Sequence, residues 1–174
     1  MIATGTMWDL DDTHGAIRVE SVYETDVEDL WQACTDPARL ARWIVQVAGD
    51  FRVGGVLDAT FTSTWTGVMR IEVCEAPHHL VVTQEPGTDE ETVIEAWFSA
   101  EGAQSRLVVE ERGLGVGVLH FHAAGWQVHL EDLGHSLRSA SGAHPSGWSA
   151  TEPAPAWNER WQALLPAYEA VRAS

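Results

Sequence analysis

Residues 116–139 read VGVLHFHAAGWQVHLEDLGHSLRS, and this stretch decides the fold. Its apolar residues recur at alternating steps of four and three. They are Leu119, Ala123, Trp126, Leu130, Leu133 and Leu137. This spacing places one apolar stripe along a helix of about six turns. The sequence therefore predicts a long amphipathic helix over 116–139 that buries one face.

The chain before this helix has the period-two pattern of β-strands. A hairpin is predicted from segments 6–10 and 17–24, and further strands over 47–53, 56–64, 68–75, 80–85, 92–100 and 105–112. The connections are short and rich in Gly, Pro and Asp, so we expect antiparallel pairing. Two short helices follow the first long strand. Thr25 and Glu28 suggest a capping box for the first, and Asp36 before Pro37 an N-cap for the second.

A long amphipathic helix that follows antiparallel strands is best buried on the concave face of their sheet. The sequence thus predicts an α+β fold, in which a curved antiparallel β-sheet wraps around a long C-terminal α-helix. At 174 residues the chain is expected to form one domain. We expect its core over about 16–139, a linker over 140–156 and an additional helix over 157–172, kinked or split at Pro166.

The composition excludes several classes of protein. The chain has 26 acidic residues against ten arginines and no lysine, for a formal charge of −16, and 45% of its residues are hydrophobic. This balance argues against disorder and against binding to nucleic acid or to an anionic membrane surface. No apolar segment is long enough to span a bilayer, and MIATGTMWDLDDTHG lacks the features of a signal peptide. We expect a cytoplasmic protein in which Cys34 and Cys74 are buried thiols.

Alternation along the strands predicts which side chains point toward the helix. The predicted inward residues are Leu57, Ala59, Phe61, Met69, Ile71, Val73, Val93, Glu95, Trp97, Leu107, Val109 and Glu111. Glu95 is the most informative of them, because burying a lone carboxylate costs several kcal/mol. It is a candidate catalytic acid or base, or a contact for a polar ligand group. The alternative is a bulged strand, or an ion pair with an arginine near the mouth. Glu111 is expected at the rim.

His122 and His129 lie on the same flank of the predicted helix as Trp126. They are candidate polar contacts in a cavity, with His122 also a candidate catalytic residue. The alternative is that both are surface or hydrogen-bonded core histidines. Seven residues separate them, which is about 10.5 Å along a helix, and neither HxxxH nor HExxH occurs. We therefore expect no metal site. The glycines of GLGVG at 113–117 suggest a loop hinge at the mouth.

Nine tryptophans exceed the ordinary packing needs of a chain of this size. Trp43, Trp65, Trp97 and Trp126 are candidates to line an aromatic cavity, and we expect at least two of them to do so. Phe61 and Met69 complete the candidate ligand-binding set, together with Glu95 and the two histidines.

Several segments together resemble the START-like (SRPBCC) superfamily, and within it the activator of heat-shock-protein ATPase homologue group. They are VEDLWQACTDPARLARW at 27–43, the pair Gly54-Gly55, Arg106-Leu107, and Gly125-Trp126 with Leu130 and Leu133. The resemblance implies a helix-grip fold with a hydrophobic tunnel between sheet and helix. Members of the superfamily bind lipids, sterols, polyketides or other apolar molecules, and some are cyclases or hydrolases.

The function that the sequence predicts is binding of an apolar, aromatic or polycyclic small molecule, without a cofactor. One alternative is a cyclase- or hydrolase-like enzyme that uses Glu95 and a histidine of the tunnel as an acid–base pair. Another is a co-chaperone-like protein-interaction module. The chaperone-binding region of the group's namesake has no counterpart in the sequence, which argues against that role. A homodimer is left open.

Overall fold

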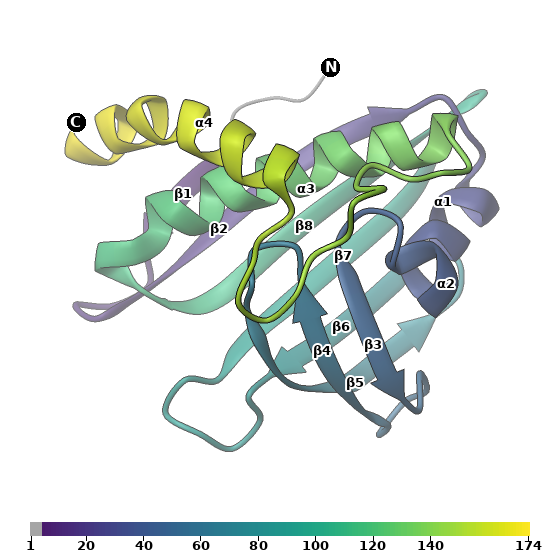
Figure 1. Ribbon diagram of the computed structural model, residues 1–174. Coiled ribbons are helices and arrows are strands. Elements are labelled where there is room, and N and C mark those ends of the chain that lie inside the picture. Colours follow the sequence, from purple (N-terminus) through teal and green to yellow (C-terminus); the bar gives the residue numbers. More distant parts are fainter. Residues whose placement is uncertain (1–4) are drawn as a thin grey trace.

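The computed structural model describes residues 5–174 (Figure 1). Residues 1–4, part of the segment examined for a signal peptide, lie outside this range. The strands are β1 (Thr6–Asp9), β2 (His14–Tyr23), β3 (Val45–Gly49), β4 (Val56–Phe61), β5 (Thr66–Glu75), β6 (His79–Gln84), β7 (Thr92–Glu101) and β8 (Gln104–Gly115). The α-helices are α1 (Val27–Thr35), α2 (Pro37–Leu40), α3 (Leu119–Arg138) and α4 (Pro155–Ala173).

The strands form one sheet in the order β1-β2-β8-β7-β6-β5-β4-β3, and every neighbouring pair is antiparallel. The sheet curves around one side of α3, and α4 lies over α3 on the side away from the sheet (Figure 1). The predicted α+β, helix-grip arrangement is thereby confirmed.

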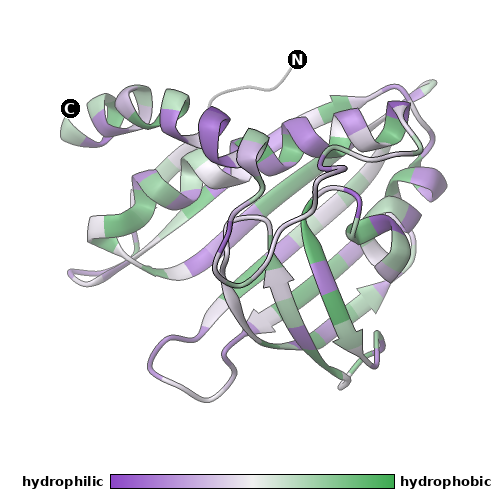
Figure 2. Cartoon of the chain, viewed as in Figure 1, coloured by the Kyte–Doolittle hydropathy of each residue, from purple (hydrophilic) through white to green (hydrophobic). Residues whose placement is uncertain are grey.

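Helix α3 buries the stripe that the sequence predicts. Leu119, Ala123, Leu130 and Leu133 are fully buried, and Leu137 is half-buried at the last turn. The α-helix begins at Leu119, later than predicted, because residues Val116–Val118 form a short 3-10 helix. No side chain caps its N-terminus. Figure 2 shows apolar residues along the strands that face this helix.

The two short helices differ in how well their caps were predicted. Asp36 caps α2 as expected, with its carboxylate accepting from the backbone N–H of Ala38 at 2.8 Å. The predicted capping box of α1 is wrong. Its N-cap is Asp26, whose carboxylate accepts from the N–H of Asp29 at 2.8 Å, while the Thr25 hydroxyl donates to the Asp29 side chain. A carboxylate directly before the helix outcompetes the threonine one position earlier.

The predicted phase of β7 is wrong by one residue. Its inward row is Ile94, Ala96 and Phe98, of which Ala96 and Phe98 are buried. Glu95 and Trp97 therefore face the convex side of the sheet, since successive side chains point to opposite faces. Ile94 is paired with the buried Glu111 of β8, which fixes this register.

A β-bulge changes the phase of β5 in the same way. The pairing with β6 shifts between Ile71 and Val73, so that Ile71 lies opposite Val82 and Val73 opposite Val81. Val81 is in turn paired with Glu95. Val73 therefore joins the convex row, against the prediction that it faces inward.

The predicted linker is an ordered strap, residues 140–154, held to the rest of the molecule by hydrogen bonds. The N–H of Ala143 donates to Arg42 O at 2.8 Å and the N–H of Ala154 to Thr62 O at 2.9 Å. The Trp148 indole donates to Thr60 O at 2.9 Å. The strap thereby connects α3 to α4 across the β4 side of the sheet (Figure 1).

Helix α4 is continuous through Pro166, so it is not split there as the sequence suggested. It is anchored by Tyr168, whose hydroxyl donates to Gln127 Oε1 and accepts from the N–H of Gly5, both at 2.7 Å. Both cysteines are free thiols, Cys34 buried and Cys74 half-buried. Within residues 5–174, no helix has the length and apolar character needed to cross a bilayer.

Candidate functional site

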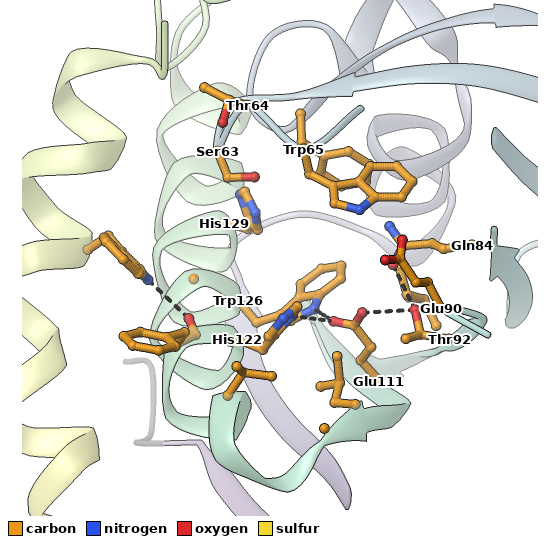
Figure 3. A pocket seen from close by; sticks show the side chains of 18 of the residues that line it. Ser63, Thr64, Trp65, Gln84, Glu90, Thr92, Glu111, His122, Trp126 and His129 are labelled. Atoms are coloured by element: carbon orange, nitrogen blue, oxygen red, sulfur yellow. Dashed lines mark hydrogen bonds and ion pairs between the residues drawn. The ribbon is translucent and has the colours of Figure 1, made fainter. Parts of the chain in front are cut away.

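A pocket of about 870 Å³ lies between α3, the sheet, the strap and the start of α4 (Figure 3). Its lining residues are His14, Phe61, Ser63, Thr64, Trp65, Gln84, Asp89, Glu90, Thr92, Ile94, Glu111, Gly113, Leu114, Gly115, Val118, Phe121, His122, Gly125, Trp126, His129, Thr151, Pro153, Trp157, Asn158 and Trp161. The wall is thus aromatic over much of its area, with a group of polar side chains from β6, β7 and β8.

The pocket brings together Phe61, Trp65, His122, Trp126 and His129 from the candidate ligand-binding set. Two of the four candidate tryptophans are therefore in its wall. Whether these side chains contact a ligand stays a prediction.

The other four candidates lie elsewhere. Trp43 and Met69 are buried in the core, 3% and 6% exposed, and neither lines the pocket. The Trp43 indole donates to Ala33 O at 3.0 Å and so connects the turn after α2 to α1. Trp97 faces the convex side, where its ring stacks on His79 at a centroid distance of 6.0 Å.

Glu95, the leading candidate for acid–base chemistry, lies in an ion-pair network on the convex face. Its carboxylate accepts from His79 Nε2 at 2.7 Å and from Arg112 at 2.6 Å. Partial burial alone would raise its pKa, but these two hydrogen bonds outweigh that effect and lower it below the ordinary value. The arginine partner that the sequence offered as an alternative explanation is therefore present, and Glu95 cannot reach the pocket.

Glu111 is the buried carboxylate of the pocket, against the expectation that it sits at the rim. It is 3% exposed and comes from the middle of the inward row of β8. Its Oε2 accepts from the Trp126 indole at 2.7 Å, and its Oε1 lies 3.1 Å from the Thr92 hydroxyl (Figure 3). The same hydroxyl is 2.9 Å from Gln84 Oε1, so the one hydroxyl proton of Thr92 is shared between two acceptors.

His122 lies next to this carboxylate on α3. Its Nδ1 is 3.4 Å from Glu111 Oε2, and its side chain is 39% exposed. One helical turn separates it from Trp126, so both side chains reach Glu111 from the same face of the helix. This pair could bind a polar ligand group or exchange a proton with it.

His129 has a different environment, enclosed by aromatic rings. Its ring stacks on Trp157 at 5.5 Å and meets Trp126 edge-on at 5.5 Å, and its Nδ1 lies 3.5 Å from the Thr62 hydroxyl. Burial is the main cause that lowers its pKa from 6.5 to about 3, with smaller electrostatic contributions from the neighbouring His144 and His122. His129 is therefore neutral at physiological pH, as in the alternative that placed it in the core.

Sequence reasoning missed the contribution of α4 to the pocket. Trp157 stacks on Trp161 at 5.7 Å, and Trp161 lies 5.9 Å from Phe121. Gly125 on α3 lies against these rings, and a Cβ there would meet the Trp157 ring at 3.4 Å, an ordinary van der Waals distance. The four-residue spacing of the two tryptophans predicted an apolar helix face, but it did not predict which surface this face would cover.

The Trp157 indole N–H is buried and has no hydrogen-bond partner among the described residues. Across residues 5–174, no group of three or more His, Cys, Asp or Glu side chains is arranged to hold a metal ion. The pocket offers aromatic surface, one buried carboxylate and three histidines, His14, His122 and His129, among its chemical groups.

Comparison with known protein families assigns the chain to one of them. Residues 24–138 match the family described as "Activator of Hsp90 ATPase homolog 1-like protein". The chain belongs to this family, which is of the SRPBCC type. A comparison with curated proteins found no match.

Solved structures with the same fold include CalU16 from Micromonospora echinospora. Its crystal structure is 24% identical, with a TM-score of 0.74, and the match covers 100% of this chain and 98% of CalU16. DynU16, a protein of the dynemicin biosynthetic locus, is 19% identical with a TM-score of 0.67 over 74% of this chain and 49% of DynU16. NE0264 from Nitrosomonas europaea is 14% identical with a TM-score of 0.61 over 71% and 94% of the two chains. At these identities the likeness extends to the fold alone.

Proposed function

We propose that this protein binds an apolar aromatic small molecule in the pocket between the sheet and α3. The observation that carries the proposal is the pocket itself, about 870 Å³ with six aromatic side chains in its wall. Pockets for small molecules usually have volumes of about 300–1,000 Å³ and present a few polar groups on a mainly apolar wall. The six aromatic residues are Phe61, Trp65, Phe121, Trp126, Trp157 and Trp161.

The family and the neighbours support a small-molecule role in coarser terms. The SRPBCC-type fold places a pocket between a curved sheet and a long helix, and DynU16 belongs to a biosynthetic locus. The proposal that the ligand is aromatic rests on the aromatic side chains in the wall of this pocket. The cytoplasmic location and the homodimer stay predictions.

A neutral fluorescent probe tests the proposal. N-phenyl-1-naphthylamine is apolar, aromatic and uncharged at neutral pH, so the acidic character of the protein does not bias its binding. We expect saturable binding with one site per chain, seen as a rise in probe emission and a fall in tryptophan emission. Trp65→Ala should weaken binding about fivefold or more, because this ring forms part of the wall and makes an edge contact with Phe61 at 5.4 Å.

Trp97→Ala is the matched control, because it removes the same side chain from the convex face of the sheet. We expect its affinity for the probe to equal that of the wild type. Equal weakening in the two variants, or no saturable binding by the wild type, would contradict the proposal.

A second candidate function, acid–base catalysis, rests on the contact between Glu111 and His122. Glu111 is buried in the pocket wall beside the partly exposed His122, where a carboxylate can take a proton from a bound C–H group. The ring opening of 5-nitrobenzisoxazole probes for such a base: the carboxylate takes the ring C–H proton, the N–O bond breaks and a phenolate is released. We expect turnover above the rate in acetate buffer, lost in Glu111→Gln and kept in Glu95→Gln. A wild type no faster than acetate would exclude this candidate.

A further inference from the structure

Apart from three histidines, the ionisable side chains that line the pocket are all acidic. Asp89, Glu90 and Glu111 line it, and none of the ten arginines does, although all ten lie in the described part of the chain. Eight of the arginines form ion pairs with carboxylates elsewhere. Three carboxylates and no arginine thus line the pocket, a balance that favours a positively charged ligand group.

Glu111 is the least exposed of these carboxylates and has no arginine partner. Glu95 on β7 follows Ile94, the residue that pairs with Glu111, and so lies on the opposite face of the sheet. There its carboxylate accepts hydrogen bonds from both Arg112 and His79. Glu111 is more deeply buried, with a side chain 4% exposed, yet its contacts are an indole N–H, a shared hydroxyl and the partly exposed His122. Burial of a carboxylate is costly unless a positive charge compensates it. The fold thus places an incompletely compensated negative charge in the pocket wall.

The aromatic wall favours a positive charge as well. The faces of tryptophan and phenylalanine rings attract cations through their quadrupoles, most strongly where water is excluded. Trp126 lies directly beside Glu111, and Trp65 is in the wall near the end that carries Gln84 and Glu90 (Figure 3). Aromatic faces and carboxylates together are the chemistry that recognises a protonated amine on an otherwise flat, apolar molecule.

We propose that the pocket selects ligands that join an aromatic body to a protonated amine, with the amine held near Glu111. This inference rests on the proposed binding function and adds the charge of the ligand to it. The aromatic body lies against the tryptophans. The ammonium group is the positively charged partner that no arginine provides for Glu111. Anionic ligands of the same shape are rejected, because the carboxylates of the wall repel them.

Three ligands of matched shape test the charge preference: 2-(1-naphthyl)ethylamine, 2-(1-naphthyl)ethanol and 1-naphthylacetate. Their affinities are measured by displacement of N-phenyl-1-naphthylamine at an ionic strength of about 0.3 M, which screens the long-range field of the protein. We expect the amine to bind about tenfold tighter than the alcohol, equivalent to about 1.4 kcal/mol. The carboxylate should bind more weakly than the alcohol.

Glu111→Gln is the decisive variant, because the amide oxygen can still accept from the Trp126 indole while the charge is lost. We expect the ratio of the affinity for the amine to that for the alcohol to fall about fivefold or more in this variant. Glu90→Gln, on the exposed loop after β6, should lower the ratio by a smaller factor without risk to folding. Glu95→Gln removes the same charge from the convex face and should keep the wild-type ratio.

The outcomes separate the two proposals. If the neutral probe binds and the amine and the alcohol have equal affinities, the charge preference is wrong and the binding function stands. If Glu95→Gln lowers the ratio as much as Glu111→Gln does, the preference arises from net charge, and this inference is overturned. If the neutral probe does not bind at all, the binding function itself fails.

Discussion

The histidines on α3 show how strongly the surroundings decide the role of a residue. His122 and His129 are seven positions apart on one helix, and the sequence treats them alike. The first is partly exposed beside a carboxylate, whereas the second is 5% exposed within a group of aromatic rings. The pKa of His129 is lowered to about 3, with burial as the main cause.

This difference predicts a pH-dependent stability that originates at His129. Its folded pKa of about 3 lies below the unfolded value of 6.5, so the unfolded chain takes up the proton first as the pH falls. The contribution of His129 to stability is complete above about pH 6.5 and is lost progressively toward pH 3. Between pH 7 and pH 4.5 this loss should amount to about 2.5 kcal/mol.

His129→Phe keeps an aromatic ring at this position and removes the titration. Urea unfolding at both pH values should show a smaller loss of stability on acidification than in the wild type. His135→Gln, at a side chain 61% exposed, serves as the control and should keep the wild-type dependence. Equal pH dependence in the wild type and in His129→Phe would show that His129 is not held neutral.

At the scale of elements, the strap is the segment whose role is hardest to predict from the sequence. Its one buried ionisable contact is between His144 Nε2 and Asp132 Oδ2, at 2.7 Å, with the two side chains 2% and 9% exposed. Burial raises the pKa of Asp132, although the hydrogen bond from His144 opposes that effect. The contact fastens the strap to α3.

Loss of this contact should be costly. His144→Ala leaves Asp132 buried without its partner, and we expect the free energy of unfolding to fall by about 2–4 kcal/mol. Adding Asp132→Asn should recover part of the loss, because no unpaired charge then stays buried. Urea unfolding measures both effects. His135→Ala, which removes an exposed neighbour 3.9 Å from the other carboxylate oxygen, should change stability by less than about 0.5 kcal/mol. A similar loss in both single variants would contradict this role of the strap.

The elements themselves were predictable where one pattern dominated. The 4–3 spacing over 119–137 specified α3 and its buried face, and short turn-rich connections specified antiparallel pairing. The phase of β7 was not predictable, because both of its faces carry apolar residues: Val93 and Trp97 on one, Ile94 and Phe98 on the other. The register with β8 decides between the two faces, and it depends on contacts distant in sequence.

The same limit explains the parts of the site that the sequence missed. Glu111 could be placed on the inward row of β8, but its neighbours Thr92 and Trp126 come from two other elements. The strap is fixed largely through backbone groups, such as the N–H of Ala154 on Thr62 O, which leave no mark in the amino-acid pattern. Of the five candidate residues that reached the pocket, Phe61, His122, Trp126 and His129 did so because β4 and α3 were read in the correct phase, whereas Trp65 lies in the turn after β4.

At the scale of the whole molecule, the fold separates its charges by face. Arg18 and Arg112 on the convex side pair with Glu110, whereas the concave side encloses the aromatic pocket and Glu111. The strap and the start of α4 contribute Thr151, Pro153, Trp157, Asn158 and Trp161 to the pocket wall. The tail beyond α3 is therefore part of the candidate site, as the contact of Trp157 with His129 shows.

The central claim is that an aromatic molecule binds within this concave pocket, and the nine tryptophan indoles can report where it binds. The most direct measurement is a two-dimensional NMR titration of the ¹⁵N-labelled protein with N-phenyl-1-naphthylamine, with each indole N–H assigned by substitution. We expect the resonances of Trp65, Trp126, Trp157 and Trp161 to shift with one common affinity, and those of Trp43 and Trp97 to stay in place. Shifts confined to Trp97, or no saturable shift at any indole, would contradict the account.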